Sequence, residues 1–259
     1  LICCVHCAST ADSSKTAGGT ASATTANAAA SAFDSSDPCS SMASLDDPIL
    51  APLREKMLTP GETITAEGID PAVMVKIAEM QAAEAKRRAR DWANLCRYRD
   101  ENQSFATSGK RPQVVFLGDS ITENWILADP EFFGARQLDR GISGQTTPQI
   151  LLRVYPDVVA LRPLVVHILA GTNDIAGNTG PVSDEVIVDN IRAMVDIAKA
   201  NRVAVVLGSI LPARFLSWEP DVTPANRIAA LNRRLSALAV ERDLVFVDYH
   251  AALGDVGGG

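Results

Sequence analysis

The chain has 259 residues, of which 47% are hydrophobic and 21% are charged, so it is long enough to build one sizeable domain with an additional segment. Lys and Arg number 24 against 31 Asp and Glu, a formal net charge of −7. This balance argues against nucleic-acid binding, because that affinity depends on basic groups that meet phosphates. The apolar runs are short, as in Val203–Leu207, and none approaches the roughly 18 residues of a spanning helix. We therefore expect no nucleic-acid partner and no integral membrane segment.

Residues 1–45 contain almost nothing that could form a core. Residues 8–44 are dominated by Ala, Ser and Thr, and such a stretch cannot offset its own ordering entropy, so we expect a low-complexity tether. The apolar start Leu1–Val5 is typical of the tail of a signal peptide, with a truncated or mis-assigned start as the alternative. On the first interpretation the protein is extracytoplasmic, either periplasmic or secreted.

Five cysteines in a chain of this length do not make a disulfide scaffold. Three of them lie in Cys3-Cys4-Val5-His6-Cys7, whose spacing matches no common zinc pattern and which no second ligand pair follows. We therefore expect no metal site. Cys39 and Cys96 stand apart from this group, and Cys96 lies on the apolar face of a predicted helix, which indicates a core position.

Residues 46–111 are expected to form an N-terminal helical extension. Apolar side chains recur there at near-helical spacing, which predicts one long helix over Pro71–Glu101. Its apolar positions are Ile77, Met80, Trp92, Leu95 and Cys96. The basic positions between them are Lys86, Arg87, Arg88 and Arg90. We expect the basic residues to form a solvated face and the apolar stripe to pack on the domain that follows.

From residue 112 to residue 259, short apolar strands alternate with helices. The predicted strands are Gln113–Leu117, Gln137–Arg140, Leu164–Leu169, Val203–Leu207 and Leu244–Val247. Helices are predicted at about 148–161, 184–200 and 224–242. Thr147-Pro148 and Thr223-Pro224 each place a capping hydroxyl before a proline, which marks a helix start. Such alternation indicates a parallel sheet covered on both faces, a three-layer α/β/α fold whose ligands bind at the carboxyl ends of the strands.

The first three predicted strands each end in small residues followed by polar side chains. These segments are Gly118–Thr122, Arg140–Thr147 and Gly171–Asp174. No lysine lies near them as a phosphate-binding loop would require, and we expect no cofactor. An aspartate nucleophile at Asp119 would need a second acid two residues on, where Ile121 stands. Ser120 fits a nucleophile better, at a tight strand-to-helix turn with N–H groups nearby to receive an oxyanion. The common elbow G-x-S-x-G is absent because Thr122 replaces its second glycine.

Three sequence blocks, in this order, resemble those of the SGNH hydrolases, also called the GDSL esterase/lipase family: Phe116–Thr122, Gly141–Gly144 and Gly171–Asp174. The resemblance covers about residues 112–252. The platelet-activating-factor-acetylhydrolase-like branch of this family is the most similar. The resemblance implies a flavodoxin-like fold with a five-stranded parallel sheet in the order 2-1-3-4-5. It also implies a carboxylic ester hydrolase that cleaves acyl or acetyl esters of a small molecule or a carbohydrate.

The resemblance also implies roles for individual residues. Ser120 is the nucleophile, and its own N–H, the N–H of Gly144 and the side-chain amide of Asn173 form the oxyanion hole. Gly144 is taken rather than Gly141 because the donor glycine of the family directly precedes the polar residue of the block, here Gln145.

The family's fourth block, a D-x-x-H that supplies the base and the acid that orients it, is not found before Gly259. His6 lies in the expected tether, and His167 lies mid-strand, where a hydrogen-bonded core histidine is expected. His250 follows Asp248 with the spacing D-x-H. It follows the fifth strand, which lies three strand positions from the first in that order, or about 14 Å at roughly 4.8 Å per strand.

We therefore expect residues 112–259 to be a C-terminally truncated hydrolase domain. A form extended through a D-x-x-H is expected to be at least about 1,000-fold more active. Two alternatives stay open: a non-catalytic binding protein of the same fold, and a nucleotide or phosphate binder, which the absent phosphate motif disfavours. The oligomeric state is left open.

Four other residues near the blocks have expected roles. Asp119 is expected to brace the turn through backbone hydrogen bonds, and Asp174 is expected to cap the loop after Asn173. Trp125 and Trp218 fit either an acyl or sugar pocket or buried packing.

Overall fold

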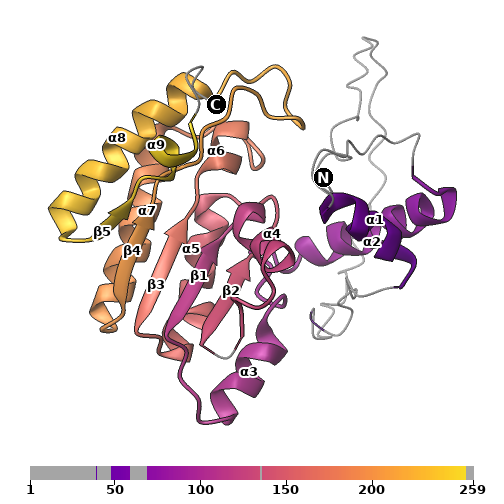
Figure 1. Cartoon of the computed structure of the whole chain (residues 1–259), viewed down its shortest axis with the longest axis horizontal. Helices are drawn as coiled ribbons and strands as arrows, with labels where there is room; N and C mark the ends of the chain where they lie inside the picture. The colour runs from indigo at the N-terminus through magenta and orange to yellow at the C-terminus, as the bar shows by residue number, and fades with distance from the viewer. Residues whose placement is uncertain (1–38, 40–47, 59–68, 135, 255–259) are drawn as a thin grey trace, which may run out of the picture.

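The computed structural model describes Cys39 and residues 48–58, 69–134 and 136–254 (Figure 1). Its centre is a sheet of five parallel strands in the order β2-β1-β3-β4-β5. The strands are β1 (Val114–Gly118), β2 (Gln137–Gly141), β3 (Val165–Leu169), β4 (Ala204–Gly208) and β5 (Val245–Val247). The predicted fold class and strand order are confirmed, and each strand begins within one residue of its predicted position.

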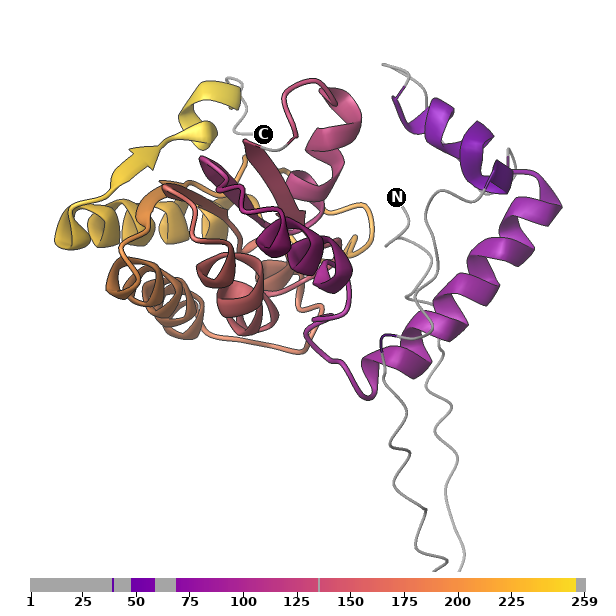
Figure 2. The same cartoon turned by 90° about the horizontal axis from the view of Figure 1, so that it is seen from below.

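Helices flank the sheet on both faces (Figure 2). One face carries α5 (Thr147–Asp157), α7 (Asp184–Ala200) and α8 (Ala225–Arg242), and the other carries α4 (Ser120–Ala128) and α9 (Tyr249–Leu253). The short helices η5 (Val159–Leu161) and α6 (Thr172–Ala176) lie in the connections. The main core forms between β1, β3 and β4 and the first group of helices, where Leu117, Ile168 and Leu207 are almost completely buried. No described helix is long and apolar enough to cross a membrane.

The two predicted helix starts differ from the structure in detail. Thr146, not Thr147, is the N-cap of α5, and the Gln149 side chain accepts the Thr146 N–H at 3.1 Å in a capping box. The Thr147 hydroxyl instead donates to the Asp174 carboxylate. At α8 the N-cap is Pro224, without a side-chain capping bond, so the capping role predicted for Thr223 is wrong.

The single helix predicted over Pro71–Glu101 is also wrong. The chain forms α2 (Pro71–Arg88), an irregular turn, and then α3 (Arg99–Thr107). Asp91 stops the first helix, because its carboxylate accepts the N–H groups of Leu95 and Cys96 at 2.7 and 2.9 Å. These bonds replace the helical pattern, and Asn94 follows with a left-handed φ of 56°.

Arg87 accordingly does not lie on a solvated face. Its guanidinium is buried, and it donates to the Asn94 side chain at 2.6 Å and pairs with Asp91 at 3.3 Å. A helical plot places Arg87 among exposed basic residues, but the turn after α2 folds back over it.

The predicted apolar stripe is divided between two environments. Ile77 packs with Leu50, Leu53 and Val73 in a small separate cluster, with Met80 at its edge. This cluster joins α2 to η3 (Pro48–Leu50) and α1 (Ala51–Leu58). Further along, Trp92 and Leu95 are about half exposed, at 47% and 44%. The stripe therefore does not pack on the sheet domain as one surface.

Cys96 is buried as expected, but it forms a disulfide with Cys39. The two positions are 57 residues apart, and spacing alone does not reveal a pairing at that distance. The expectations for the rest of residues 1–45, including the Cys3–Cys7 group, lie outside the described residues.

Candidate active site

Ser120 stands at the turn from β1 into α4, as the first residue of that helix. Asp119 is the N-cap, and its Oδ1 accepts the Ile121 N–H at 3.0 Å; this confirms the expected bracing role. Ser120 is partly exposed, and neither its N–H nor its hydroxyl has a hydrogen-bond partner among the described residues. Both groups are therefore available to a ligand at this turn.

The helix that begins at Ser120 packs directly against the end of β2. A Cβ at Gly141 would lie 2.1 Å from the Glu123 nitrogen, so any side chain at that position would push the helix away. Glu123 in turn accepts the Ser143 N–H at 2.7 Å and the Ser143 hydroxyl at 2.5 Å. The second block is thereby fixed to the helix that carries Ser120.

Gly144 and Asn173 complete the cluster predicted from the sequence. Gly144 has a φ of 77°, a conformation that favours glycine, and its N–H has no partner in the described part of the chain. The Asn173 amide donates to the Gln145 carbonyl at 2.9 Å and to Asp119 Oδ2 at 3.3 Å. The structure therefore brings the ends of β1, β2 and β3 together at one edge of the sheet.

Asn178 also belongs to this cluster, although it is not among the residues predicted from the sequence. Its side-chain amide donates to Asn173 Oδ1 at 3.0 Å and to the Gly144 carbonyl at 3.1 Å. The Trp218 indole N–H donates to Asn178 Oδ1 at 3.3 Å, which places the half-buried Trp218 beside the site. The position of Asn178 between Gly177 and Gly180, in the loop that follows the third block, was the sequence feature that could have identified it.

Asp174 was expected to cap the loop after Asn173, and this expectation is wrong. Its carboxylate accepts the Thr147 hydroxyl at 2.6 Å and the Thr147 N–H at 2.9 Å. This contact joins the third block to the first turn of α5, which explains why Thr147 is not the helix cap. Burial raises the pKa of the Asp174 carboxyl, and its hydrogen bonds with Thr147 oppose that shift.

Asp119 is the charge nearest to Ser120 in the chain, and it is completely buried. Burial raises the pKa of the Asp119 carboxyl to about 7; the Ile121 hydrogen bond opposes the shift, and the Asp174 charge adds to it. The carboxyl therefore titrates near neutral pH, and the negative charge beneath the Ser120 turn changes in that range.

His167 is a core residue, which confirms the sequence interpretation. It lies on β3 opposite Phe116 of β1, and its Nε2 is 3.0 Å from the Tyr249 hydroxyl. Burial lowers the pKa of the imidazole to about 4. Its position two residues before the end of β3 keeps it below the edge where Ser120 lies.

His250 follows β5, three strands from β1 in the sheet. Its N–H donates to the Ser209 hydroxyl at 2.9 Å, and Asp248 accepts the Ala251 N–H at 2.9 Å as the N-cap of α9. No described residue hydrogen-bonds to the His250 imidazole. Asp248 and His250 are therefore not arranged as an acid–base pair with Ser120.

Trp125 of α4 packs against other aromatic rings. Its ring stacks on Phe132 at 5.8 Å between centroids and meets the edge of Phe116 at 5.3 Å, which favours the packing interpretation. A cavity of about 480 Å³ lies between α3, α4 and the free edge of β2. Its lining includes neither Ser120 nor Asn173, so this cavity is separate from the cluster at the strand ends.

Residues 116–259 match the model of a family described as GDSL-like Lipase/Acylhydrolase. No curated protein matches the chain.

Several solved structures are similar. A protein of Bacteroides fragilis NCTC 9343, described as "a putative acylhydrolase", is 43% identical over 64% of this chain and 81% of its own, with a TM-score of 0.61. A GDSL-like lipase of Bacteroides thetaiotaomicron VPI-5482 is 42% identical over 63% and 81%, with a TM-score of 0.59. A protein of "Streptococcus pneumonia", described as "a putative platelet activating factor", is 23% identical over 68% and 85%, with a TM-score of 0.52; this last likeness shows the fold alone.

Proposed function

The chain belongs to the GDSL-like lipase/acylhydrolase family, and on this premise we propose that it is a carboxylic ester hydrolase with Ser120 as its nucleophile. Family membership confirms the resemblance drawn from the three blocks, and it supports ester hydrolysis as the general activity. The observation that carries the residue assignment is the meeting of Ser120, Gly144 and Asn173 at adjacent strand ends, with two backbone N–H groups that have no described partner.

In the proposed reaction the Ser120 hydroxyl attacks the ester carbonyl carbon, and the carbonyl electrons move to its oxygen. The N–H groups of Ser120 and Gly144 and the Asn173 amide donate to that oxyanion. Asn173 already donates twice, and its longer bond, to Asp119 at 3.3 Å, is the one that an oxyanion would replace. Collapse of the intermediate breaks the ester C–O bond, and the leaving oxygen takes the proton that the general base removed from Ser120, so that the alcohol is released. Water then cleaves the acyl-enzyme, which releases the carboxylic acid and restores the Ser120 hydroxyl.

A general base has to take the proton of the Ser120 hydroxyl. His167 is buried below the site and bonded to Tyr249, and His250 lies three strands away. We therefore assign neither of these histidines as the base.

The substrate class is an ester of a short acyl or acetyl group with a small molecule or a carbohydrate. The Trp218 indole beside Asn178 supports this choice, because it offers an apolar ring face next to the proposed oxyanion donors. We also propose an extracytoplasmic location. The Cys39–Cys96 disulfide supports it, since disulfides persist mainly in oxidising compartments.

The test is Ser120→Ala in an active, full-length form of the protein that supplies the general base, assayed with p-nitrophenyl acetate and with a fluorophosphonate probe. We expect turnover to fall at least about 1,000-fold and labelling to disappear. The unfolding midpoint should stay unchanged, because loss of one partly exposed hydroxyl leaves no core cavity. Ser104→Ala, an exposed serine on α3, is the matched control. Wild-type turnover in Ser120→Ala would refute the assignment.

A non-catalytic ester-binding protein is the second candidate, because neither described histidine lies beside Ser120. It predicts that the wild-type protein binds a short-chain ester, and that wild type and Ser120→Ala show the same background hydrolysis.

A further inference from the structure

The turn between α2 and α3 makes two hydrogen bonds to the segment Arg140–Thr147 and one to the first turn of α5. The Ala93 carbonyl accepts from the Gln145 side chain at 2.7 Å, and the Trp92 carbonyl accepts from Gln149 at 2.9 Å. The Tyr98 hydroxyl donates to the Gly141 carbonyl at 2.6 Å. Residues 92–98, which we call the supporting turn, are thus joined to the segment that contains Gly144.

The supporting turn is itself held by hydrogen bonds and a disulfide. Asp91 accepts the N–H groups of Leu95 and Cys96, and it pairs with the buried Arg87. Cys96 is bonded to Cys39. The supporting turn is therefore held in place, so it can resist a displacement of the segment that contains Gly144.

Gln145 is the link between this turn and the site. Its side chain is 2% exposed, and both of its polar atoms are used: Oε1 accepts from Arg153 Nε at 2.7 Å, and Nε2 donates to Ala93. Its backbone directly follows Gly144, and its carbonyl accepts the Asn173 amide at 2.9 Å. Gln145 therefore follows Gly144 directly and hydrogen-bonds to Asn173, so it contacts two of the three proposed oxyanion donors.

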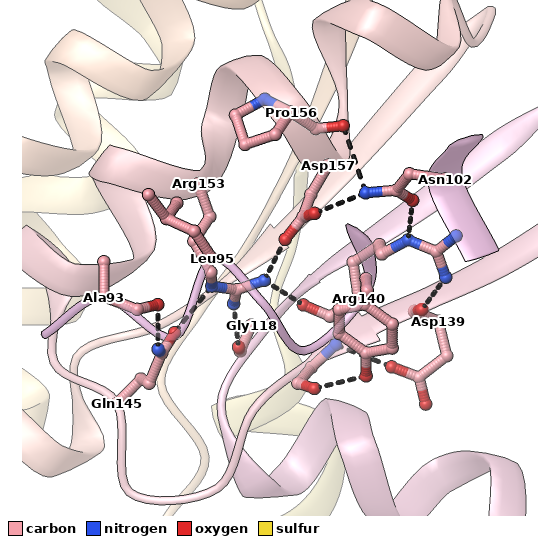
Figure 3. Close-up of polar contacts among 12 residues, drawn as sticks. Ala93, Leu95, Asn102, Gly118, Asp139, Arg140, Gln145, Arg153, Pro156 and Asp157 are labelled. Carbon is pink, nitrogen blue, oxygen red and sulfur yellow. Dashed lines mark hydrogen bonds and ion pairs between the residues drawn. The ribbon is translucent and has the colours of Figure 1, made fainter. Parts of the chain in front are cut away.

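Arg153 extends the link to the nucleophile turn, as Figure 3 shows. This guanidinium is completely buried; it donates to the Gly118 carbonyl at 3.2 Å and the Arg140 carbonyl at 3.1 Å, and it pairs with Asp157 at 2.5 Å. Gly118 precedes Asp119 and Ser120. The network therefore reaches both the strand end that carries the nucleophile and the loop that carries Gly144.

We propose that Gln145 is a positioning residue, which holds the segment that contains Gly144 between Arg153 and the supporting turn. The N-terminal extension is then a structural part of the active site. The proposal rests on the proposed function. Oxyanion donors act only within a narrow range of distances, and a displacement of about 1 Å can cost on the order of 100-fold in rate. Loosening Gln145 should therefore affect the transition state more than the bound substrate.

Gln145→Glu removes the donor to Ala93 with almost no change of shape and keeps the acceptor for Arg153. We expect kcat to fall about 10- to 100-fold with KM within about threefold. Gln149→Glu is the matched control: it keeps the acceptor for the Thr146 N–H and loses only its donor bond to Trp92. Its kcat should stay within about twofold of wild type. A similar fall of kcat in both variants would mean a general loss of structure and would overturn the proposal.

Tyr98→Phe is a second variant that should fold in any case, because the ring remains and only the bond to Gly141 is lost. We expect its kcat to fall about 3- to 10-fold at constant KM. Wild-type kcat in Tyr98→Phe and in every folded Gln145 variant would refute the proposal.

Hydrogen exchange separates this proposal from the proposed function, because it needs no activity. A peptide that covers residues 141–147 should exchange faster in Gln145→Glu than in Gln149→Glu. Unchanged exchange in Gln145→Glu would refute the positioning role even if the protein were inactive. If exchange were faster in Gln145→Glu but turnover did not depend on Ser120, the positioning role would be supported. Only the proposed function would then be refuted.

Discussion

Asn173 links all three strand ends through one side chain, which donates to Gln145 and Asp119 and accepts from Asn178. Replacing it by alanine should lower kcat by about 100- to 1,000-fold with a smaller change in KM, because its charge-stabilising contact forms mainly in the transition state. Steady-state kinetics on a short-chain ester measures both. A loss confined to KM would instead make Asn173 a substrate-binding residue.

Asp139 on β2 gives the fold a pH dependence. Burial raises the pKa of its carboxyl to about 7; Oδ1 accepts the Gly141 N–H at 2.6 Å, and buried Oδ2 has no hydrogen-bond partner among the described residues. A carboxyl with a raised folded-state pKa stabilises the fold below its unfolded pKa of roughly 4, and this contribution is lost as the pH rises toward 7.

We therefore expect Asp139→Asn to flatten the pH profile. From pH 5 to pH 7, the wild type should lose about 2 kcal/mol more of its free energy of unfolding than the variant does. Urea unfolding at the two pH values measures the difference. Because Asp119 shares the direction of this shift and His167 opposes it, only the difference between the two proteins isolates Asp139. Parallel profiles would contradict the assignment.

At the scale of elements, the buried side-chain amide of Asn232 links α8 to the segment after β4. Asn232 accepts the Ile210 N–H at 2.8 Å and donates to the Ile210 carbonyl at 2.9 Å. Asn232→Ala leaves both backbone groups unpaired, so we expect a loss of about 2–4 kcal/mol in the free energy of unfolding.

Arg234→Ala on the same helix removes only the exposed ion pair with Glu185. It should leave the urea midpoint unchanged, because exposed pairs contribute little. Equal midpoints for the Asn232 and Arg234 variants would show that the buried amide does not fasten the helix.

At the scale of the whole molecule, the Cys39–Cys96 disulfide joins the N-terminal region to the supporting turn and closes a loop with a sequence separation of 57. Replacing both cysteines by serine should lower the free energy of unfolding by about 2–4 kcal/mol, chiefly because the unfolded chain gains conformational freedom. Thermal unfolding with and without dithiothreitol measures this. The reductant should lower the midpoint of the wild type and leave the double variant unchanged, and a wild type insensitive to reductant would contradict the prediction.

The strands, the larger helices after residue 112 and the three blocks were predictable because each depends on a local pattern. Near-continuous apolar strands alternating with helices indicate a parallel sheet. In such a sheet the carboxyl ends of the strands share one edge, so the three segments that follow β1, β2 and β3 were predictable neighbours. The family resemblance then pointed to Ser120, Gly144 and Asn173 within them. The tight approach at Gly141 and the left-handed backbone at Gly144 give a physical reason for the glycines in the second block.

Only the tertiary structure decided which distant groups pair. The apolar stripe predicted a helix through residue 101, but Asp91 offers its carboxylate to the backbone, and Arg87 is buried against it. Likewise Thr147 gives its hydroxyl to Asp174 rather than to its own helix, and Cys96 pairs with Cys39. Periodicity records which side chains share a face of an element. It does not record which polar groups meet across elements, because that depends on how the packed layers bring distant backbone and side-chain atoms within hydrogen-bonding distance.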